Sequence, residues 1–164
     1  MNLQLVPVSR SLTKLDFDCG YPDLNNYLRH YAVKNDQLSI GKTFLALSDS
    51  IVAGYFTIST AQIVSAELPE TLRIKLPRYP VPAFRIGKLA VNKELQGLGV
   101  GQWLLHQALE KAVLVSRDVA IYAILVDAID EKAKQFYLKY GFIPFQEFPL
   151  TLFLPLETIK NARG

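Results

Sequence analysis

Three alternate glycines stand directly before a stretch of helical character. Gly97, Gly99 and Gly101 belong to the segment "LQGLGVG", and apolar residues at helical spacing follow them. Glycine disfavours helix formation, so something other than helix propensity must place it there. The first N–H groups of a helix have no internal partner, and together with the helix dipole they attract anions. Because glycine has no Cβ atom, a phosphate could approach those groups closely, and the segment predicts a site for a phosphorylated ligand.

Two common phosphate-binding loops do not fit this segment. A P-loop requires Gly-Lys-Ser/Thr before its helix, whereas Gln102 and Trp103 follow the last glycine. A dinucleotide fingerprint counted from Gly97 would need glycine at position 102, and it normally follows the first strand of its domain. A purely structural role, in which the glycines allow tight packing of a strand on a helix, stays open as the alternative.

The elements around the glycines predict a mixed α/β sheet with parallel neighbours. We expect a strand over 83–92, with a phase shift at 87–88 that suggests a bulge, and a helix after the glycines. The apolar face of this helix comprises Leu104, Leu105, Ala108, Leu109 and Ala112. Residues 119–128 predict a strand buried on both faces, and 130–142 a helix capped by Asp130 and ended by Gly141. Two more strands close the chain, and this alternation is typical of α/β folds.

The first half of the chain predicts smaller elements. A short strand is expected at 5–9, and one or two short helices over 21–38, started by Pro22 and Asp23. Two β-rich runs over 43–60 surround the turn residues 48–50, which predicts a hairpin. The proline-punctuated segment 76–82 predicts a loop or sheet edge.

Length and composition predict a single globular domain over residues 1–164. Half of the residues (50%) are hydrophobic and 20% are charged, which excludes a disordered chain. Cys19 is the single cysteine and cannot form an internal disulfide. No apolar run has the length of a membrane span, and the N-terminus lacks the apolar core of a signal peptide. We therefore expect a cytoplasmic protein without a membrane partner.

Basic residues gather before and within the strand that precedes the glycines. Residues 71–93 contain no Asp or Glu and hold Arg73, Lys75, Arg78, Arg85, Lys88 and Lys93. A local positive surface would suit the phosphates of a cofactor, a nucleic acid or both. A solvated edge with its charges scattered over several faces is the alternative, and charge alone does not separate the two.

The glycine segment resembles the acetyl-CoA signature Q/R-x-x-G-x-G/A of the GNAT superfamily of N-acetyltransferases. A second stretch, "DAIDEKAKQFYLKYGF", is similar to the D-x-x-N-x-x-A-x-x-F-Y-x-x-x-G-F helix of that superfamily. The resemblance implies a GNAT fold of the α/β (α+β) class. It has a mixed central sheet, splayed at the cofactor strand, and flanking helices.

Other segments narrow the resemblance to the GNAT toxins of bacterial toxin–antitoxin pairs. These are "FDCGYPDLNNYLRHYA", "KTFLAL" and above all "LPRYPVPAFRIGKLAVNKELQGLGVGQWLL". Such toxins acetylate the α-amino group of aminoacyl-tRNA and stop translation. The resemblance also implies a homodimer and a small ribbon-helix-helix antitoxin as partners.

The resemblance assigns acetyl-CoA to the strand and the glycine turn. The implied cofactor-binding residues are Leu89, Ala90, Val91, Gln96, Gly97, Leu98, Gly99, Val100, Gly101, Gln102 and Asp130. Asp130 departs from the asparagine that many members carry, although it still caps the helix. Backbone N–H groups of the strand would also polarise the thioester carbonyl.

The resemblance places the general acid at Tyr137. A thiol pKa of about 8.5 and a tyrosine pKa of about 10 make a tyrosine hydroxyl a feasible proton donor to the departing thiolate. Tyr140 is the competitor. Its spacing from Phe136 suits an apolar seam of Ala133, Phe136 and Tyr140, whereas Tyr137 lies off that seam.

Other features bear on the acceptor. The strand 84–92 has no carboxylate to serve as a base, which favours an α-amino acceptor with a pKa of about 8 over a lysine of about 10.4. Arg78, Arg85, Lys88 and Lys93 are the candidate tRNA contacts. His30 and His106 lack metal-like spacing, so no metal is expected. An acetyltransferase acting on a small-molecule or protein amine, and a non-catalytic acyl-CoA-binding module, are the alternatives.

Overall fold

The computed structural model describes residues 1–163, which divide into two compact units. The first unit comprises Met1–Ser59 and Gly87–Ala108, and the second comprises Thr60–Ile86 and the described residues from Leu109 onward. Each unit thus draws on two separate segments of the chain. Within the described residues, every helix is too short or too polar to cross a membrane.

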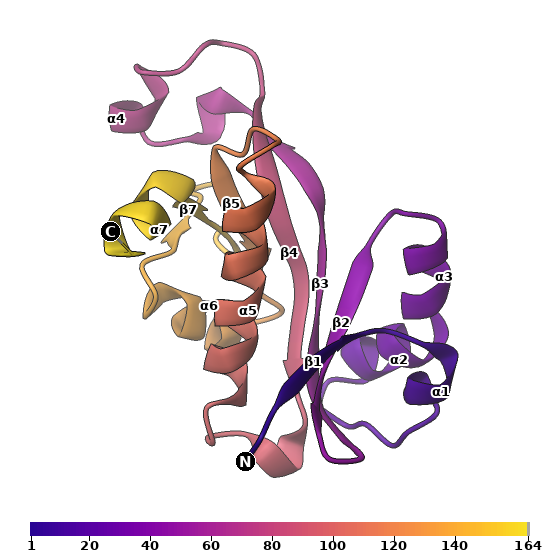
Figure 1. The fold of residues 1–164 in the computed structure, drawn as a ribbon. Helices are drawn as coiled ribbons and strands as arrows, with labels where there is room; N and C mark the ends of the chain where they lie inside the picture. Colours follow the sequence, from indigo (N-terminus) through magenta and orange to yellow (C-terminus); the bar gives the residue numbers. More distant parts are fainter. Residues whose placement is uncertain (164) are drawn as a thin grey trace. The chain divides into compact units, whose positions relative to one another are not determined.

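Seven strands form one mixed sheet in the order β1-β2-β3-β4-β5-β7-β6 (Figure 1). The strands are β1 (Gln4–Pro7), β2 (Lys42–Ser48), β3 (Ile51–Ile63), β4 (Val81–Val91), β5 (Ala123–Asp127), β6 (Ile143–Pro144) and β7 (Thr151–Pro155). β4 and β5 are parallel, whereas β1–β2, β2–β3, β5–β7 and β6–β7 are antiparallel. The predicted mixed α/β sheet with flanking helices is confirmed.

A hairpin organises the first unit, as its sequence predicts. β2 and β3 pair from Lys42↔Ile58 to Ser48↔Ile51, with a register shift between Ala46 and Leu47. Asp49 in the turn has φ 55°, a left-handed conformation that Asp tolerates better than most residues. The turn residues 48–50 therefore set the register that the alternating β-rich runs require.

Three short helices lie beside this hairpin: α1 (Arg10–Thr13), α2 (Pro22–His30) and α3 (Ala32–Gln37) (Figure 1). Pro22 begins α2, where its missing N–H costs nothing. The prediction of one or two short helices over 21–38 is confirmed, with α2 and α3 both present. Leu24 and Leu28 of α2 pack into a buried cluster with Tyr55 of β3. The Tyr55 hydroxyl donates a 2.7 Å hydrogen bond to the Leu24 carbonyl, so the polar end of this buried ring is satisfied.

The second unit is built on β5 and β7. Residues 123–126 of β5 are fully or almost fully buried, which explains their uniformly apolar sequence. The predicted start of this strand at 119 is wrong, because Val119 is exposed and regular pairing begins at Ala123. α6 (Glu131–Leu138) and α7 (Leu156–Arg163) complete this unit.

α5 (Val100–Val115) follows the glycines and buries the predicted apolar face. Leu104, Leu105, Ala108 and Ala112 are at most 2% exposed, while Leu109 is half-buried. Sequence patterns did not reveal α1, α7 or α4 (Glu70–Arg73), nor the 3-10 turns η1 (Ser65–Glu67) and η2 (Lys93–Leu95). Most of these elements span three or four residues, too few for a periodicity to show.

Gly54 of β3 marks a close approach that the sequence does not signal. A Cβ atom there would lie 2.5 Å from the Ala90 carbonyl oxygen and 2.7 Å from Leu104 Cδ1. The leucine methyl could move, but the carbonyl belongs to the backbone of β4. Gly54 therefore lets the backbone around Ala90, which is in the predicted cofactor strand, lie against β3.

We expect Gly54→Ala to lower the free energy of unfolding by about 1–3 kcal/mol, because overpacking forces the backbone to shift. Thermal or urea unfolding measures this loss. Gln62→Ala, an exposed change on the same strand, is the control and should stay within about 0.5 kcal/mol of the wild type. Equal stability of the two variants would contradict the close approach.

Candidate functional site

The predicted phosphate site is a turn of two left-handed glycines that leads into α5. Gly97 has φ +80° and Gly99 has φ +88°, and Leu98 between them is exposed. The N–H of Trp103 donates to the Gly99 carbonyl at 3.0 Å, which begins the hydrogen-bond ladder of α5. The N–H groups of Val100, Gly101 and Gln102 precede that first donor, so helix geometry gives them no partner inside α5.

The backbone conformation explains two of the three glycines. A Cβ atom added at Gly97 or Gly99 would meet nothing within 4 Å, so packing of a strand on the helix does not require glycine at either position. Their positive φ does, since side chains with a Cβ atom rarely adopt it. Gly101 differs, because it lies inside the first turn of α5. The turn therefore leaves open space over a stretch of backbone at the start of a helix.

The strand residues Leu89, Ala90 and Val91 lie at the end of β4. The ladder between β4 and β5 runs from Ala83↔Ala123 to Ile86↔Val126, so these three residues lie beyond it. The ladder ends directly before the predicted bulge at 87–88, which itself stays a prediction. The Val91 carbonyl accepts a hydrogen bond from Gln96 Nε2 at 3.2 Å and is therefore already engaged.

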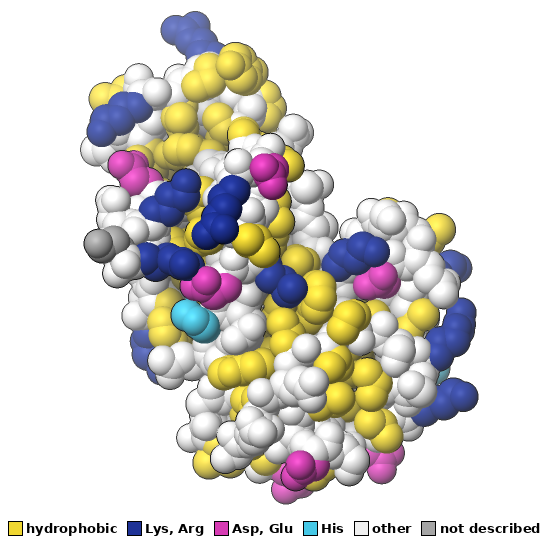
Figure 2. Space-filling model, in the orientation of Figure 1, with side chains coloured by type: hydrophobic (Ala, Val, Ile, Leu, Met, Phe, Trp, Pro, Cys, Tyr) yellow, Lys and Arg dark blue, Asp and Glu magenta, His cyan; other side chains and the backbone are white. Residues whose placement is uncertain are grey.

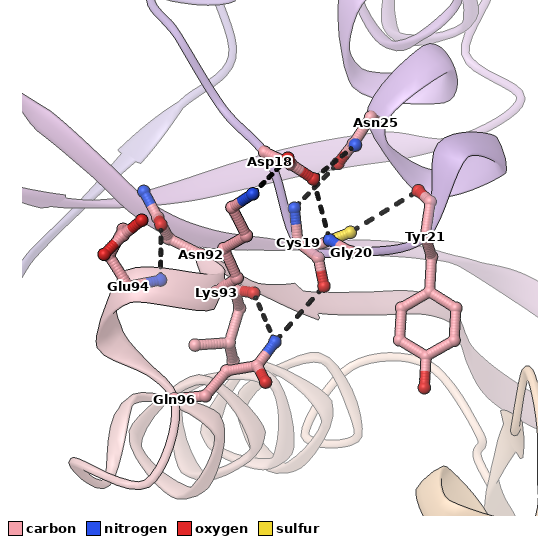
Figure 3. Close-up of polar contacts among 10 residues, drawn as sticks. Asp18, Cys19, Gly20, Tyr21, Asn25, Asn92, Lys93, Glu94 and Gln96 are labelled. Carbon is pink, nitrogen blue, oxygen red and sulfur yellow. Dashed lines mark hydrogen bonds and ion pairs between the residues drawn. The ribbon is translucent and has the colours of Figure 1, made fainter.

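A polar network ties this end of β4 to the loop before α2 (Figure 3). The Asp18 carboxylate accepts hydrogen bonds from the Gly20 N–H at 2.8 Å and from Asn25 Nδ2 at 2.9 Å. It also forms an ion pair with Lys93 Nζ at 3.0 Å, and the Lys93 N–H donates to the Asp18 carbonyl at 2.8 Å. These contacts lower the pKa of Asp18 from 3.8 to about 2, the Asn25 hydrogen bond contributing most.

Gln96 joins the same network from the other side. Its Nε2 donates to the Cys19 carbonyl at 3.2 Å as well as to the Val91 carbonyl (Figure 3). The side-chain amide of this predicted cofactor residue thus holds the turn in place. Cys19 is buried, and burial raises the pKa of its thiol, which disfavours a nucleophilic role.

Sequence reasoning missed Asp18 and Asn25, although one signal was present. Asp18 and Gly20 form an Asx turn, in which the side chain bonds the N–H two residues on, and Asp-x-Gly is typical of it. The partners Asn25 and Lys93 are remote in sequence, so no local pattern could have paired them.

The four candidate tRNA contacts have different surroundings. Lys93 is held by Asp18, which raises its pKa, and Lys88 Nζ lies 4.2 Å from the centre of the Tyr27 ring. Arg85 is 3.5 Å from Asp127, whereas the Arg78 side chain is exposed. Figure 2 shows one face of the molecule, on which Lys and Arg side chains alternate with Asp and Glu. The basic segment 71–93 therefore serves several local roles.

Tyr137 belongs to the second unit and is 3% exposed. Its ring meets Phe136 and Phe142 edge-on at 5.3 and 5.6 Å. Burial, and to a lesser degree the charge of Asp127, raise the pKa of its hydroxyl above the usual 10. The predicted apolar seam of α6 is wrong, because Ala133, Phe136 and Tyr140 are half-buried and Tyr137 is the buried residue. The helix is short, and aromatic residues cover more than one of its faces.

Asp130 caps α6, as predicted. Its carboxylate accepts a hydrogen bond from the Ala133 N–H at 2.9 Å. Gly141, with φ +88°, follows the helix as a left-handed C-terminal residue. Both ends of α6 are therefore defined by residues that the sequence analysis named.

Comparisons with known proteins place this geometry in context. A sequence profile of the acetyltransferase (GNAT) domain matches residues 40–144. A tRNA-acetylating toxin of Mycobacterium tuberculosis is 32% identical over 148 residues, which cover 90% of this chain and 87% of that protein.

Two solved structures are similar over nearly the whole chain. AtaT complexed with acetyl-methionyl-tRNAfMet has a TM-score of 0.89 and 28% identity, and the match covers 99% of this chain and 100% of that chain. A tyrosine-to-phenylalanine variant of AtaT, bound to the C-terminus of the antitoxin AtaR and to acetyl-CoA, has a TM-score of 0.81 and 26% identity, with 98% of each chain covered.

We expect Gly97→Ala to weaken acetyl-CoA binding by about tenfold, equivalent to about 1.4 kcal/mol, because a left-handed alanine is strained by about 1–2 kcal/mol and would relax by rotating the turn. Isothermal titration with acetyl-CoA measures the affinity. Gly141→Ala introduces the same strain at φ +88° outside the turn, so it should lower the melting temperature and leave the affinity unchanged. Equal affinities of the two variants would contradict a role of the turn in binding.

The Asp18 network predicts a pH dependence of stability. The pKa of the Asp18 carboxyl in the folded protein is about 2, below its ordinary value of 3.8. The ionised carboxylate therefore contributes to stability above about pH 4, and this contribution is lost as the pH falls through about 2. Asp18→Asn should therefore lower the melting temperature at pH 7, and its difference from the wild type should shrink below about pH 4.

Melting curves between pH 7 and 2 test this dependence. Asn25→Ala removes the strongest donor to Asp18 and also the acceptor of the Cys19 N–H at 2.8 Å, so part of its loss should persist at low pH. Asn26→Ala on the exposed side of α2 should follow the wild type. A constant difference between wild type and Asp18→Asn over the whole range would rule the network out as its origin.

Proposed function

Because the chain belongs to the GNAT family of acetyltransferases, we propose that it transfers an acetyl group from acetyl-CoA to the α-amino group of aminoacyl-tRNA and thereby blocks translation. The observation that carries this proposal is the similarity to a tRNA-acetylating toxin along nine-tenths of the chain. AtaT, similar over its whole length, was solved with acetyl-methionyl-tRNAfMet. Membership of the acetyltransferase family alone would not favour aminoacyl-tRNA over other amines, but the similarity to these two proteins does.

The residues of the glycine turn fit acetyl-CoA. The N–H groups at the start of α5 can receive pyrophosphate oxygens, and the space over Gly97 and Gly99 is open. Leu89, Ala90 and Val91 would offer strand backbone to the pantetheine arm. Acetyl-CoA supplies an activated acetyl thioester when bound. Gln96 and Lys93 keep the turn in position through the loop around Asp18.

Tyr137 is the proposed general acid. Its raised pKa keeps a proton on Oη throughout the physiological range, so the hydroxyl is present as a donor and not as a general base. The surrounding rings of Phe136 and Phe142 restrict the tyrosine ring and keep water away from it. An α-amino acceptor, partly neutral near pH 8, makes a strong protein base unnecessary.

Further parts of the proposal concern partners. Arg78 is the foremost candidate for a phosphate contact, since its side chain is exposed. AtaT was solved with the C-terminus of an antitoxin, AtaR, and we propose an antitoxin of the ribbon-helix-helix class for this chain. We further propose a cytoplasmic homodimer, with the sequence 1–164 as a single acetyltransferase domain.

Incubating the purified protein with labelled acetyl-CoA and a pool of charged tRNA tests the acceptor. We expect label on the aminoacyl group, and none on uncharged tRNA. Label that reaches only small amines or proteins would refute the tRNA assignment and favour the small-molecule or protein acceptor. Thiol release with none of these acceptors present defines the background.

Tyr137→Phe should lower turnover by about tenfold or more, because it removes the proton donor and keeps the ring. Steady-state kinetics with charged tRNA measures kcat, and the melting temperature should change little. Tyr140→Phe is the matched control on the same helix and should retain wild-type turnover. A larger loss in the control than in Tyr137→Phe would move the role to Tyr140.

A further inference from the structure

Three polar side chains form a row on one face of the sheet in the second unit. Arg85 of β4 lies in register with Leu125 of β5, and Asp127 follows two residues later on the same face of β5. Thr151 of β7 lies directly opposite Asp127. The row therefore crosses three neighbouring strands.

The contacts within this row are long. Arg85 Nε is 3.5 Å from Asp127 Oδ2, and Thr151 Oγ1 is 3.5 Å from Asp127 Oδ1. Both distances lie at or beyond the limit of a good hydrogen bond. Among the residues that the structure describes, the buried Arg85 Nε has no hydrogen-bond partner. The side chains of Arg85 and Asp127 are 41% and 38% exposed, so a ligand could reach them.

Folding alone does not account for this pair. Leu125 of β5, in register with Arg85 and on the same face, is buried, so an apolar residue at position 85 could pack there without an unpaired donor. An unpaired buried donor typically costs about 1–3 kcal/mol. The buried Nε lies out of reach of a ligand, but the remainder of the half-exposed Arg85 side chain and the accessible carboxylate of Asp127 could bind one.

The row lies in the electrostatic surroundings of the proposed general acid. The negative charge of Asp127 contributes to the raised pKa of Tyr137. Among the described residues, Arg85 from β4 and Tyr137 from α6 are charged or titratable groups that interact with Asp127, and Thr151 from β7 is neutral. A group bound by Asp127 and Arg85 would therefore lie near the proton donor.

We propose that Arg85 and Asp127 recognise the α-amino acyl ester of the acceptor, with Asp127 accepting a hydrogen bond from the amine and Arg85 donating one to the ester carbonyl. This inference rests on the proposed function. An α-amino ester carries an N–H donor and a carbonyl acceptor close together, which a carboxylate and a guanidinium complement. Arg85 thus binds the acyl end of the substrate instead of a tRNA phosphate.

The pairing also suits the chemistry of the amine. An isolated carboxylate would stabilise the ammonium form, which cannot attack a thioester. The positive charge of Arg85 offsets that effect, so Asp127 can orient the amine without raising the pKa of the amine by much. The two residues are specificity-determining, and they should act on the pKa of the bound amine in opposite directions.

Kinetics with three acceptors tests the proposal: charged tRNA, methionine ethyl ester, and n-propylamine, which lacks the carbonyl. We expect Asp127→Asn and Arg85→Gln each to lower kcat/KM about tenfold or more for charged tRNA and for the ester. Arg85→Gln should change the value for n-propylamine less than twofold. Asp36→Asn, which removes the exposed ion pair with Lys42 at 3.1 Å, is the control and should leave all three unchanged.

The pH dependence of kcat separates recognition from a structural role. The acid limb should move to lower pH in Asp127→Asn and to higher pH in Arg85→Gln, since kcat reports the bound amine. Acetyl-CoA affinity should stay within twofold of the wild type. Shifts of the same sign, equal losses for ester and n-propylamine in Arg85→Gln, or lost acetyl-CoA affinity would overturn the proposal.

Failure of the proposed function has a different outcome. A wild-type enzyme that acetylates the ester but not charged tRNA would refute tRNA as acceptor, and the variants would then be judged on the ester. A wild-type enzyme that prefers n-propylamine, or that acetylates neither ester nor tRNA, would overturn the recognition of α-amino acyl esters as well.

Discussion

The turn between β4 and α5 leads through two left-handed glycines to N–H groups without a partner inside α5, and it must still hold one conformation. Two left-handed glycines allow the turn to adopt its backbone conformation, but glycine also loses more conformational entropy on folding than any other residue. The hydrogen bonds around Asp18, Gln96 and Lys93 compensate, because they fasten the residues just before the turn to the loop that precedes α2. A preorganised anion site requires both features.

The basic and amide side chains of this attachment stabilise the protein, whereas their residue types suggest ligand binding. Lys93 and Gln96 look like ligand-binding groups in the sequence, yet their side chains are engaged within the first unit. Arg85, in contrast, has a half-exposed side chain, and its buried Nε lies 3.5 Å from Asp127 without a hydrogen bond from the described residues. The positions of Lys and Arg along the chain do not distinguish a side chain that stabilises a loop from one available to bind a ligand. The ion-pair and hydrogen-bond partners of such side chains come from remote segments.

Several elements could be predicted because the information is local. Gly97 and Gly99 indicate left-handed backbone, and Asp130 and Gly141 define the ends of a helix. The alternating runs around residues 48–50 indicate a hairpin. The seam of α6 could not be predicted, since Phe136, Tyr137 and Tyr140 are all aromatic and only the surrounding structure selects which is buried. Gly54 is a further example, because its requirement comes from the carbonyl of Ala90 on another strand.

The sequence by itself determined the family, the mixed α/β sheet and the glycine turn, because motifs with fixed spacing and short-range backbone preferences encode them. Only the tertiary structure decided the surroundings of the candidate chemical groups. It buried Tyr137 and raised its pKa, and it paired Asp18 with Lys93. It also brought Arg85 beside Asp127. The physical reason is that burial and charge pairing depend on distance in space, and residues that are neighbours in the sheet lie far apart along the chain.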